Sequence, residues 1–241
     1  MIFSPQGPNE NTDNFSVSLN NSKLERIGTG CQENCFKFVG IHLDDKLDWS
    51  YHLAHIKKKM AAGNYQLAQV KNFVPYHIRK TIYLCMVKSH LEYGIIIWGS
   101  GLKKFIEPLI IMQKFAICNL MKTRSRAHTA PLFHEAQLLT LEDIYTLRTC
   151  QFVREFFKGS LPQSFFDPSF FTKATEINAR EPTNRNYLNL YYGKLDSEKL
   201  IRMSQIQIQK TWNGLDDYLK QVQTDKEFKS RFTTEAINSY V

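Results

Sequence analysis

The sequence has no apolar run of about 18 residues, so we expect no membrane-spanning helix. Its first residues carry neither a basic segment nor a long apolar segment, and we expect no secretory signal. Only Cys31 and Cys35 of its five cysteines lie close together, so a disulfide framework is not expected. These absences predict a folded, soluble protein of a reducing intracellular compartment, in the nucleus or the cytoplasm.

Motifs for metal binding and catalysis are also lacking. Cys31 and Cys35 are half of a zinc ligand set, but no second Cys or His pair at finger spacing follows them. Polymerases hold two metal ions with paired carboxylates. The acidic pair Asp44–Asp45 more simply prepares a turn or a helix start. No P-loop, nucleophile elbow or His-Glu-x-x-His sequence is present. We therefore expect no metal, no cofactor and no catalytic residue.

The other histidines and cysteines that stand among apolar neighbours are predicted to be packing residues. Such a histidine is more often a partly buried side chain than a catalyst, because catalysis also needs an orienting partner. A cysteine in such a setting behaves as a small buried hydrophobe. The residues concerned are His52, His55, His128, His134, Cys85, Cys118 and Cys150.

Positive charge is concentrated in one segment. The chain carries a net charge of +8, but Tyr51–His128 holds thirteen Lys and Arg residues against Glu92 and Glu107, so this segment carries +11 and the remainder −3. The cations are Lys57, Lys58, Lys59, Lys71, Arg79, Lys80, Lys88, Lys103, Lys104, Lys114, Lys122, Arg124 and Arg126. Such a field favours a polyanion, most commonly a phosphate backbone, although a merely solvated lysine-rich surface has the same pattern.

Residues 1–44 are predicted to form two or three antiparallel strands. Phe15–Leu19 and Phe36–Leu43 alternate with a period of two, and Met1–Phe3 would be a short third strand. A sheet this small is not stable by itself. We therefore expect it to pack against helices or against a part of a larger protein.

Residues 45–159 are predicted to be a basic helical domain. Apolar positions three and four apart predict helices over 50–72, 75–93, 107–122 and 141–158, with a short helical turn over 131–136. Ser50 and Thr140 are expected N-caps, and Pro75 and Pro108 are tolerable in first turns. The expected inner-face residues are Leu53, Ile56, Met60, Gly63, Leu67, Val70, Ile78, Ile82, Cys85, Met86, Leu109, Met112, Ala116 and Leu120.

Residues 160–241 are predicted to be a loop-rich connector followed by short elements. Ile206–Ile208 has the composition of a strand, Trp212–Gly214 that of a turn, and Thr224–Glu227 that of a capping box opening a final helix. The predicted fold class is mainly α, with a small N-terminal antiparallel β region, a helical bundle and a partly irregular α+β tail.

Aromatic residues are interleaved with the cations of the basic segment. Rings beside cations can stack on unpaired bases, but at least two thirds of these rings are expected in the core, because they fall on or near the apolar stripes. The rings are Trp49, Tyr51, Tyr65, Phe73, Tyr76, Tyr83, Tyr93, Trp98 and Phe105.

The order of several short motifs resembles reverse transcriptases of LINE-type, jockey-like non-LTR retrotransposons. Phe36–Asp44, followed by Leu47–Ser50 and His52, is similar to the segment after the catalytic strands of the palm. Ser89–Gly99 then has the family's His-x-x-Tyr-Gly-x-x-x-Trp pattern. Further similar segments are Gln113–Ile117, Ala127–Phe133, Trp212–Asn213 and Phe228–Lys229.

The resemblance implies the palm end, thumb and post-thumb region of such an enzyme. Residues 1–44 would be a palm remnant, 45–159 a thumb-like domain and 160–241 the region beyond it. The strand with Phe38 and Gly40 would border the primer. The family's fingers, most of its palm and its Tyr-Ala-Asp-Asp strand have no counterpart here, so no catalytic residue is carried over.

We therefore expect a truncated fragment of an RNA-directed DNA polymerase that is not an enzyme as it stands. It would bind primer–template, as RNA/DNA hybrid or duplex, through phosphates. The candidate contacts are Lys57, Lys58, Lys59, Arg79, Lys80, Lys103 and Lys104. The alternatives are a protein-interaction module, which would self-associate or contact an intact polymerase, and a non-functional gene relic.

Overall fold

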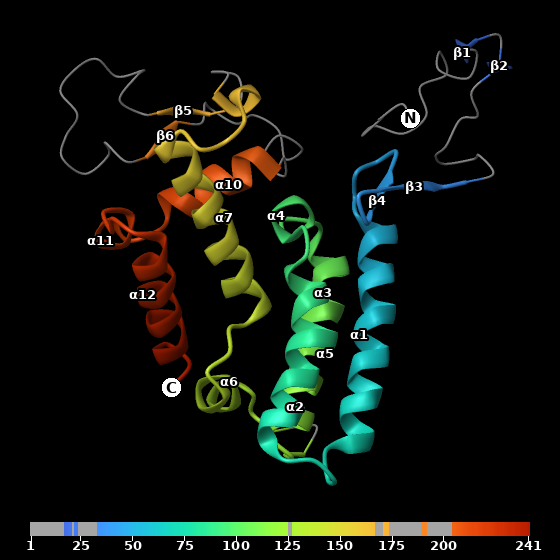
Figure 1. Ribbon diagram of the computed structural model, residues 1–241, viewed down its shortest axis with the longest axis vertical. Helices are drawn as coiled ribbons and strands as arrows, with labels where there is room; N and C mark the ends of the chain where they lie inside the picture. The colour runs from blue at the N-terminus through green and yellow to red at the C-terminus, as the bar shows by residue number, and fades with distance from the viewer. Residues whose placement is uncertain are drawn as a thin grey trace.

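The computed structural model describes residues 17–20, 22–23, 33–124, 127–166, 171–173, 189–191 and 204–241 (Figure 1). The fold is mainly α, with short antiparallel strand pairs, as the sequence predicts. The helices are α1 (Ser50–Val70), α2 (Tyr76–Tyr83), the π-helix η2 (Leu84–Lys88), α3 (Ser89–Glu92), α4 (Ile95–Trp98), α5 (Lys103–Leu120), α6 (Ala130–Ala136), α7 (Leu141–Lys158), the 3-10 helix η3 (Gln163–Phe166), α10 (Ser204–Asn213), α11 (Asp217–Lys220) and α12 (Asp225–Asn238). Among the described residues, no helix is long and apolar enough to span a membrane.

The strands are β1 (Ser18–Leu19), β2 (Ser22–Lys23), β3 (Cys35–Phe38), β4 (Ile41–Asp44), β5 (Thr172–Lys173) and β6 (Leu190–Tyr191). The prediction of one strand over Phe36–Leu43 is wrong, because this run folds back on itself as the hairpin β3–β4. Its turn residues Val39 and Gly40 both have positive φ, 45° and 78°, as a two-residue type I′ turn requires. Met1–Phe3 lies outside the described residues.

α1 and α5 run parallel to each other along the basic half of the molecule (Figure 1). Asn64 Nδ2 donates to the carbonyl O of Met112 at 3.0 Å, and Lys71 Nζ donates to Asn119 Oδ1 at 2.9 Å. Both pairs are separated by 48 residues in sequence. A residue of α1 therefore lies level with the residue of α5 that is 48 positions later.

The run from α2 through η2 to α3 presents a different inner face from the one predicted. Arg79, Tyr83, Val87 and Leu91 are buried at intervals of four residues, whereas Ile78 is 41% exposed and Cys85 is also exposed. In a regular α-helix, residues four apart drift around the axis by about 40° per step, at 3.6 residues per turn. The wider π turn of η2 offsets this drift and keeps the four residues on the core side.

Gly63 allows α1 to approach η2 closely. A Cβ atom at this position would lie 2.7 Å from the carbonyl O of Met86 and 2.9 Å from its Cβ. Leu53, Ile56, Met60, Gly63 and Leu67 are all buried, so the predicted inner stripe of α1 is confirmed for these five positions.

Helix ends follow the predictions in part. Thr140 accepts a hydrogen bond from the Asp143 N–H, and Thr224 accepts one from the Glu227 N–H, so both predicted caps are confirmed. Ser50 is instead the first residue of α1, and Asp48 Oδ1 accepts its N–H at 2.9 Å. α5 begins at Lys103, four residues before the predicted start, which places Pro108 inside the helix.

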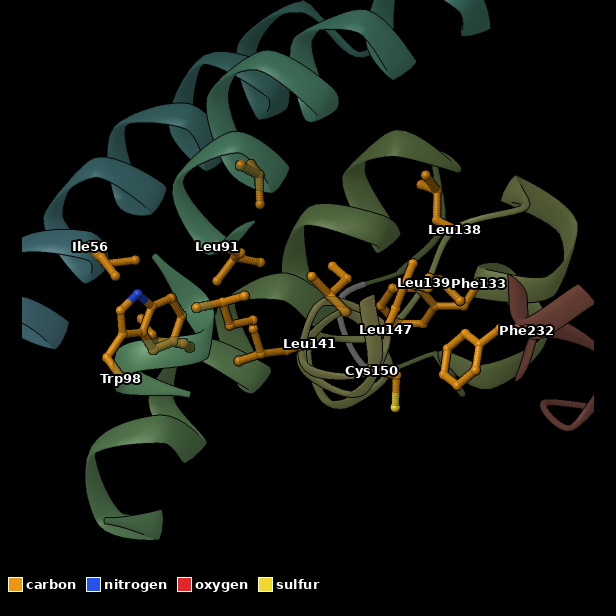
Figure 2. Close-up of a cluster of buried hydrophobic side chains, with 14 of the residues drawn as sticks. Ile56, Leu91, Trp98, Phe133, Leu138, Leu139, Leu141, Leu147, Cys150 and Phe232 are labelled. Atoms are coloured by element: carbon orange, nitrogen blue, oxygen red, sulfur yellow. The ribbon is translucent and has the colours of Figure 1, made fainter. Parts of the chain in front are cut away.

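The C-terminal helices pack on α7 and share one buried cluster with the basic half (Figure 2). The prediction of a strand over Ile206–Ile208 is wrong, because these residues lie in α10. Ile208 and Trp212 are buried one helical turn apart there, and this burial favours a helix over the local strand-like composition. The cluster runs from Ile56 and Trp98 to Phe232, and it holds the helices in one arrangement.

Candidate nucleic-acid interface

α1 presents a cationic outer face. Lys57, Lys58 and Lys59 are exposed, and the helix contains no Asp or Glu residue. At about 100° per residue, Lys58 points away from the buried positions around Met60 and Leu67, and Lys57 and Lys59 lie on either side of it. The lysine ammonium groups are therefore free to face a ligand across solvent.

The register between α1 and α5 gathers lysines from both helices. Lys57 lies level with Phe105, because the two helices are offset by 48 residues, and Lys103 and Lys104 begin α5 within one turn of that level. We define the lysine patch as Lys57, Lys58, Lys103 and Lys104, which are all exposed.

No acidic side chain of the described residues neutralises a lysine of the patch. None of its four side chains forms an ion pair within the part of the chain that the structure describes. Lys104 Nζ lies 4.6 Å from the ring centroid of Phe105, which holds the ammonium over an aromatic face. Glu107, one turn further along α5, is the nearest acidic residue in the sequence. The patch therefore keeps a positive field directed at solvent.

Lys59 lies on another side of α1, toward the histidines of the hairpin and α3. Its charge contributes to lowering the pKa of His55 and of His90, although burial is the larger cause for both. Lys59 is exposed, but it is not part of the lysine patch.

Arg79 and Lys80 are used by the fold, contrary to the expectation that they contact phosphate. Arg79 is only 7% exposed, and its Nε donates to the carbonyl O of Leu120 at 2.8 Å. Its Nη1 donates to the carbonyl O of Val74 at 2.8 Å. Lys80 Nζ donates to the carbonyl O of Ala136 at 2.8 Å. Both cations satisfy carbonyl groups at or just beyond helix ends, and we leave them out of the interface.

Phe38 and Gly40, expected beside the primer, lie at the tip of the β3–β4 hairpin. Phe38 is 59% exposed, and Gly40 occupies the turn. Tyr93 Oη donates to the carbonyl O of Val39 at 2.5 Å, so the hairpin tip is tied to the residue that follows α3. Two of the segments named for the family resemblance, Phe36–Asp44 and Ser89–Gly99, are thus in direct contact.

Exposed rings are more numerous than the sequence predicted. Trp49, Tyr83 and Trp98 are buried and Phe105 is partly buried, but the other five rings of the basic segment are exposed. They are Tyr51, Tyr65, Phe73, Tyr76 and Tyr93. The expectation that at least two thirds of the rings lie in the core is therefore wrong. The exposure of Tyr51 and Tyr65 could have been predicted from the sequence. They lie seven residues, or about two helical turns, before and after Lys58 and so share the solvent-facing side of the helix with that lysine.

Three histidines meet between β4 and α1. The His42 ring centroid lies 4.8 Å from that of His55 and 6.1 Å from that of His52. The backbone N–H of His42 donates to His52 Nδ1 at 3.4 Å, and burial lowers the pKa of His52 to about 4. The described residues contain no group of three or more His, Cys, Asp or Glu side chains able to hold a metal ion. Cys31, which with Cys35 would be only half of a zinc ligand set, lies outside the described residues.

Asp44 takes part in a turn. Its Oδ1 accepts the N–H groups of Lys46 and Asp48 at 3.1 and 3.2 Å, which supports the predicted local role. Burial raises the pKa of its carboxyl group. Of the three cysteines expected in the core, Cys118 and Cys150 are buried, whereas Cys85 is exposed and that prediction is wrong.

Comparisons with known proteins add no relative to this geometry. No protein-family model, curated protein or solved structure matches the chain.

Proposed function

We propose that this chain is a non-catalytic fragment, related to LINE-type reverse transcriptases, that binds nucleic acid through the phosphate backbone. The observation that carries the proposal is the lysine patch, in which two parallel helices carry four exposed lysines at neighbouring levels, with no ion pair to any of them among the described residues. Ammonium groups on flexible stems neutralise phosphates without reading bases. The ligand class is therefore a nucleic-acid duplex, with RNA/DNA hybrid included, bound with little sequence preference.

The proposal includes no polymerase chemistry. Nucleotide transfer requires carboxylates arranged around two metal ions. Asp44 is buried and bonded to backbone N–H groups of its own turn. Its neighbour Asp45 is half-buried, and the described residues supply no third acidic partner for a metal site.

The test is fluorescence anisotropy with a labelled primer–template duplex. Four phosphate contacts predict that affinity falls roughly 100-fold between about 50 and 200 mM salt. Replacing all four patch lysines by glutamine should flatten this dependence. The matched control replaces Lys226 and Lys229, which are exposed on α12, and should bind as the unmodified chain does. An affinity that is unchanged by salt would refute the proposal.

A second candidate function is a protein-interaction module. Phe36, Phe38 and Val39 are all more than 40% exposed on one hairpin, and exposed apolar side chains in one place are typical of interfaces. Size-exclusion chromatography with light scattering separates the two functions. A monomer at micromolar concentration that binds duplex supports nucleic-acid binding, and a concentration-dependent dimer supports the interaction module.

A further inference from the structure

Two exposed tyrosines and one lysine form a straight line along the outer face of α1. Tyr51, Lys58 and Tyr65 are spaced by seven residues, which is close to two helical turns, so their side chains leave the helix in nearly the same direction. Tyr51 is 43% exposed and Tyr65 is 66% exposed. This direction is opposite to the buried stripe of the helix, and all three side chains are exposed there.

The spacing along the helix separates the two rings by about 21 Å, with the lysine midway, at 1.5 Å per residue. That length corresponds to roughly six stacked nucleotides of one strand. Two rings with a cation between them combine both features of a sequence-tolerant single-strand surface, which are aromatic platforms for bases and charge for phosphates. In a duplex, the bases are stacked on each other and their faces are not available to tyrosine.

The upper end of this line opens into a hollow of about 400 Å³ between β3 and the start of α1. Phe36 and Tyr51 supply aromatic walls, and Lys37 and His42 supply polar groups. Glu33 is the acidic residue of the lining, and Lys37 opposes its charge. A hollow lined by aromatic rings and by polar side chains suits a planar, polar-edged ligand such as an unpaired base.

We propose that the outer face of α1 binds a single strand of RNA or DNA, with unpaired bases stacked on Tyr51 and Tyr65 and a phosphate beside Lys58. The strand runs along the helix and its end reaches the hollow at Phe36. This inference rests on the proposed function, since Lys58 also belongs to the lysine patch. It adds a second kind of ligand, a single strand continuous with a duplex held by the lysines of α1 and α5.

The experiment compares a labelled 12-nucleotide single strand, in RNA and DNA forms, with a blunt duplex of the same length. The double variant Tyr51→Ala/Tyr65→Ala should lose at least about tenfold in affinity for the single strand, because each stacked base depends on its ring. Its affinity for the duplex should stay within about twofold, because the four lysines are intact. Tyr51→Phe/Tyr65→Phe keeps both rings and should retain single-strand affinity.

Controls identify which proposal fails. Tyr218→Ala removes an exposed ring from α11, away from the basic half, and should change neither affinity. If the alanine pair weakens the single strand and the duplex equally, or weakens neither, the single-strand inference is overturned. If the unmodified chain binds neither ligand in a salt-dependent way, the proposed function fails with it.

A three-nucleotide strand is too short to reach both rings, so Tyr65→Ala should weaken the 12-mer more than the 3-mer.

Discussion

Arg79 Nε donates to the carbonyl O of Leu120 at 2.8 Å and so joins α2 to the last turn of α5. A cation of the most basic segment of the chain is therefore buried and forms hydrogen bonds within the fold. The same guanidinium donates to the carbonyl O of Val74, in the turn before α2. We therefore expect the position to matter for stability rather than for ligand binding.

Replacing Arg79 by alanine should lower the free energy of unfolding by about 2–4 kcal/mol, because buried carbonyl groups lose charged donors. Urea denaturation measures the change. Lys122→Ala, at an exposed position just after α5, is the matched control and should change stability by less than about 0.5 kcal/mol. At temperatures where both variants are folded, Arg79→Ala should keep its duplex affinity. A tenfold loss of duplex affinity with unchanged stability would show instead that Arg79 contacts the nucleic acid.

Stability should fall in mild acid because of His52. Its folded-state pKa is about 4 against an ordinary value of 6.5, so the unfolded chain binds the proton more readily. The contribution is fully present above pH 6.5 and is lost as pH falls through 4, at up to about 1.4 kcal/mol per pH unit. The groups that face this ring are His42 from β4, His55 from α1 and the Trp98 ring from α4.

Urea midpoints at pH 7.5 and pH 5 measure this dependence, and His52→Gln should reduce it. The comparison separates the effect of His52 from that of Asp44. The pKa of Asp44 is raised, so its protonation stabilises the fold as pH falls, which is opposite to the effect of His52. Equal slopes for the two proteins would show that another group titrates.

Gly63→Ala should destabilise the fold by about 1–3 kcal/mol, although alanine is the better helix former. The added Cβ meets the carbonyl O of Met86 at 2.7 Å, and backbone of η2 must move to admit it. Gln66→Ala, on the exposed side of α1, serves as the control and should be nearly neutral. Thermal unfolding followed by circular dichroism measures both, and a raised Tm for Gly63→Ala would contradict the close packing of α1 on η2.

Chelation of divalent ions should leave duplex affinity unchanged at constant ionic strength. The proposed contacts are ammonium groups, and the described part of the chain contains no cluster able to hold a metal ion. Anisotropy titrations with EDTA and with magnesium, matched in ionic strength, measure this. A loss of affinity on chelation that magnesium restores would indicate a metal-bridged contact.

Several helices and helix ends were determined by local sequence. The apolar period of α1, the Thr140 and Thr224 caps and the glycine after α7 are local signals, and local hydrogen bonding and burial act on each of them directly. The concentration of charge was equally visible, because lysines must remain near water wherever the chain folds. These features required no knowledge of distant contacts.

Tertiary structure decided which cations are available. Lys57 and Lys103 are 46 residues apart in sequence, and only the register of α1 on α5 brings them to neighbouring levels of the fold. Arg79 and Lys58 each carry one positive charge, but only Lys58 is exposed. Arg79 is buried because it donates to carbonyl groups of α5 and of the turn after α1. The π turn of η2 also changed which residues of the run from α2 to α3 are buried. A regular period of 3.6 residues does not predict this change. The charge of each side chain is therefore set by the sequence, and non-local packing decides which cations face solvent. A cation is buried only where other groups of the fold accept its hydrogen bonds, as the carbonyl groups of Leu120 and Val74 do for Arg79.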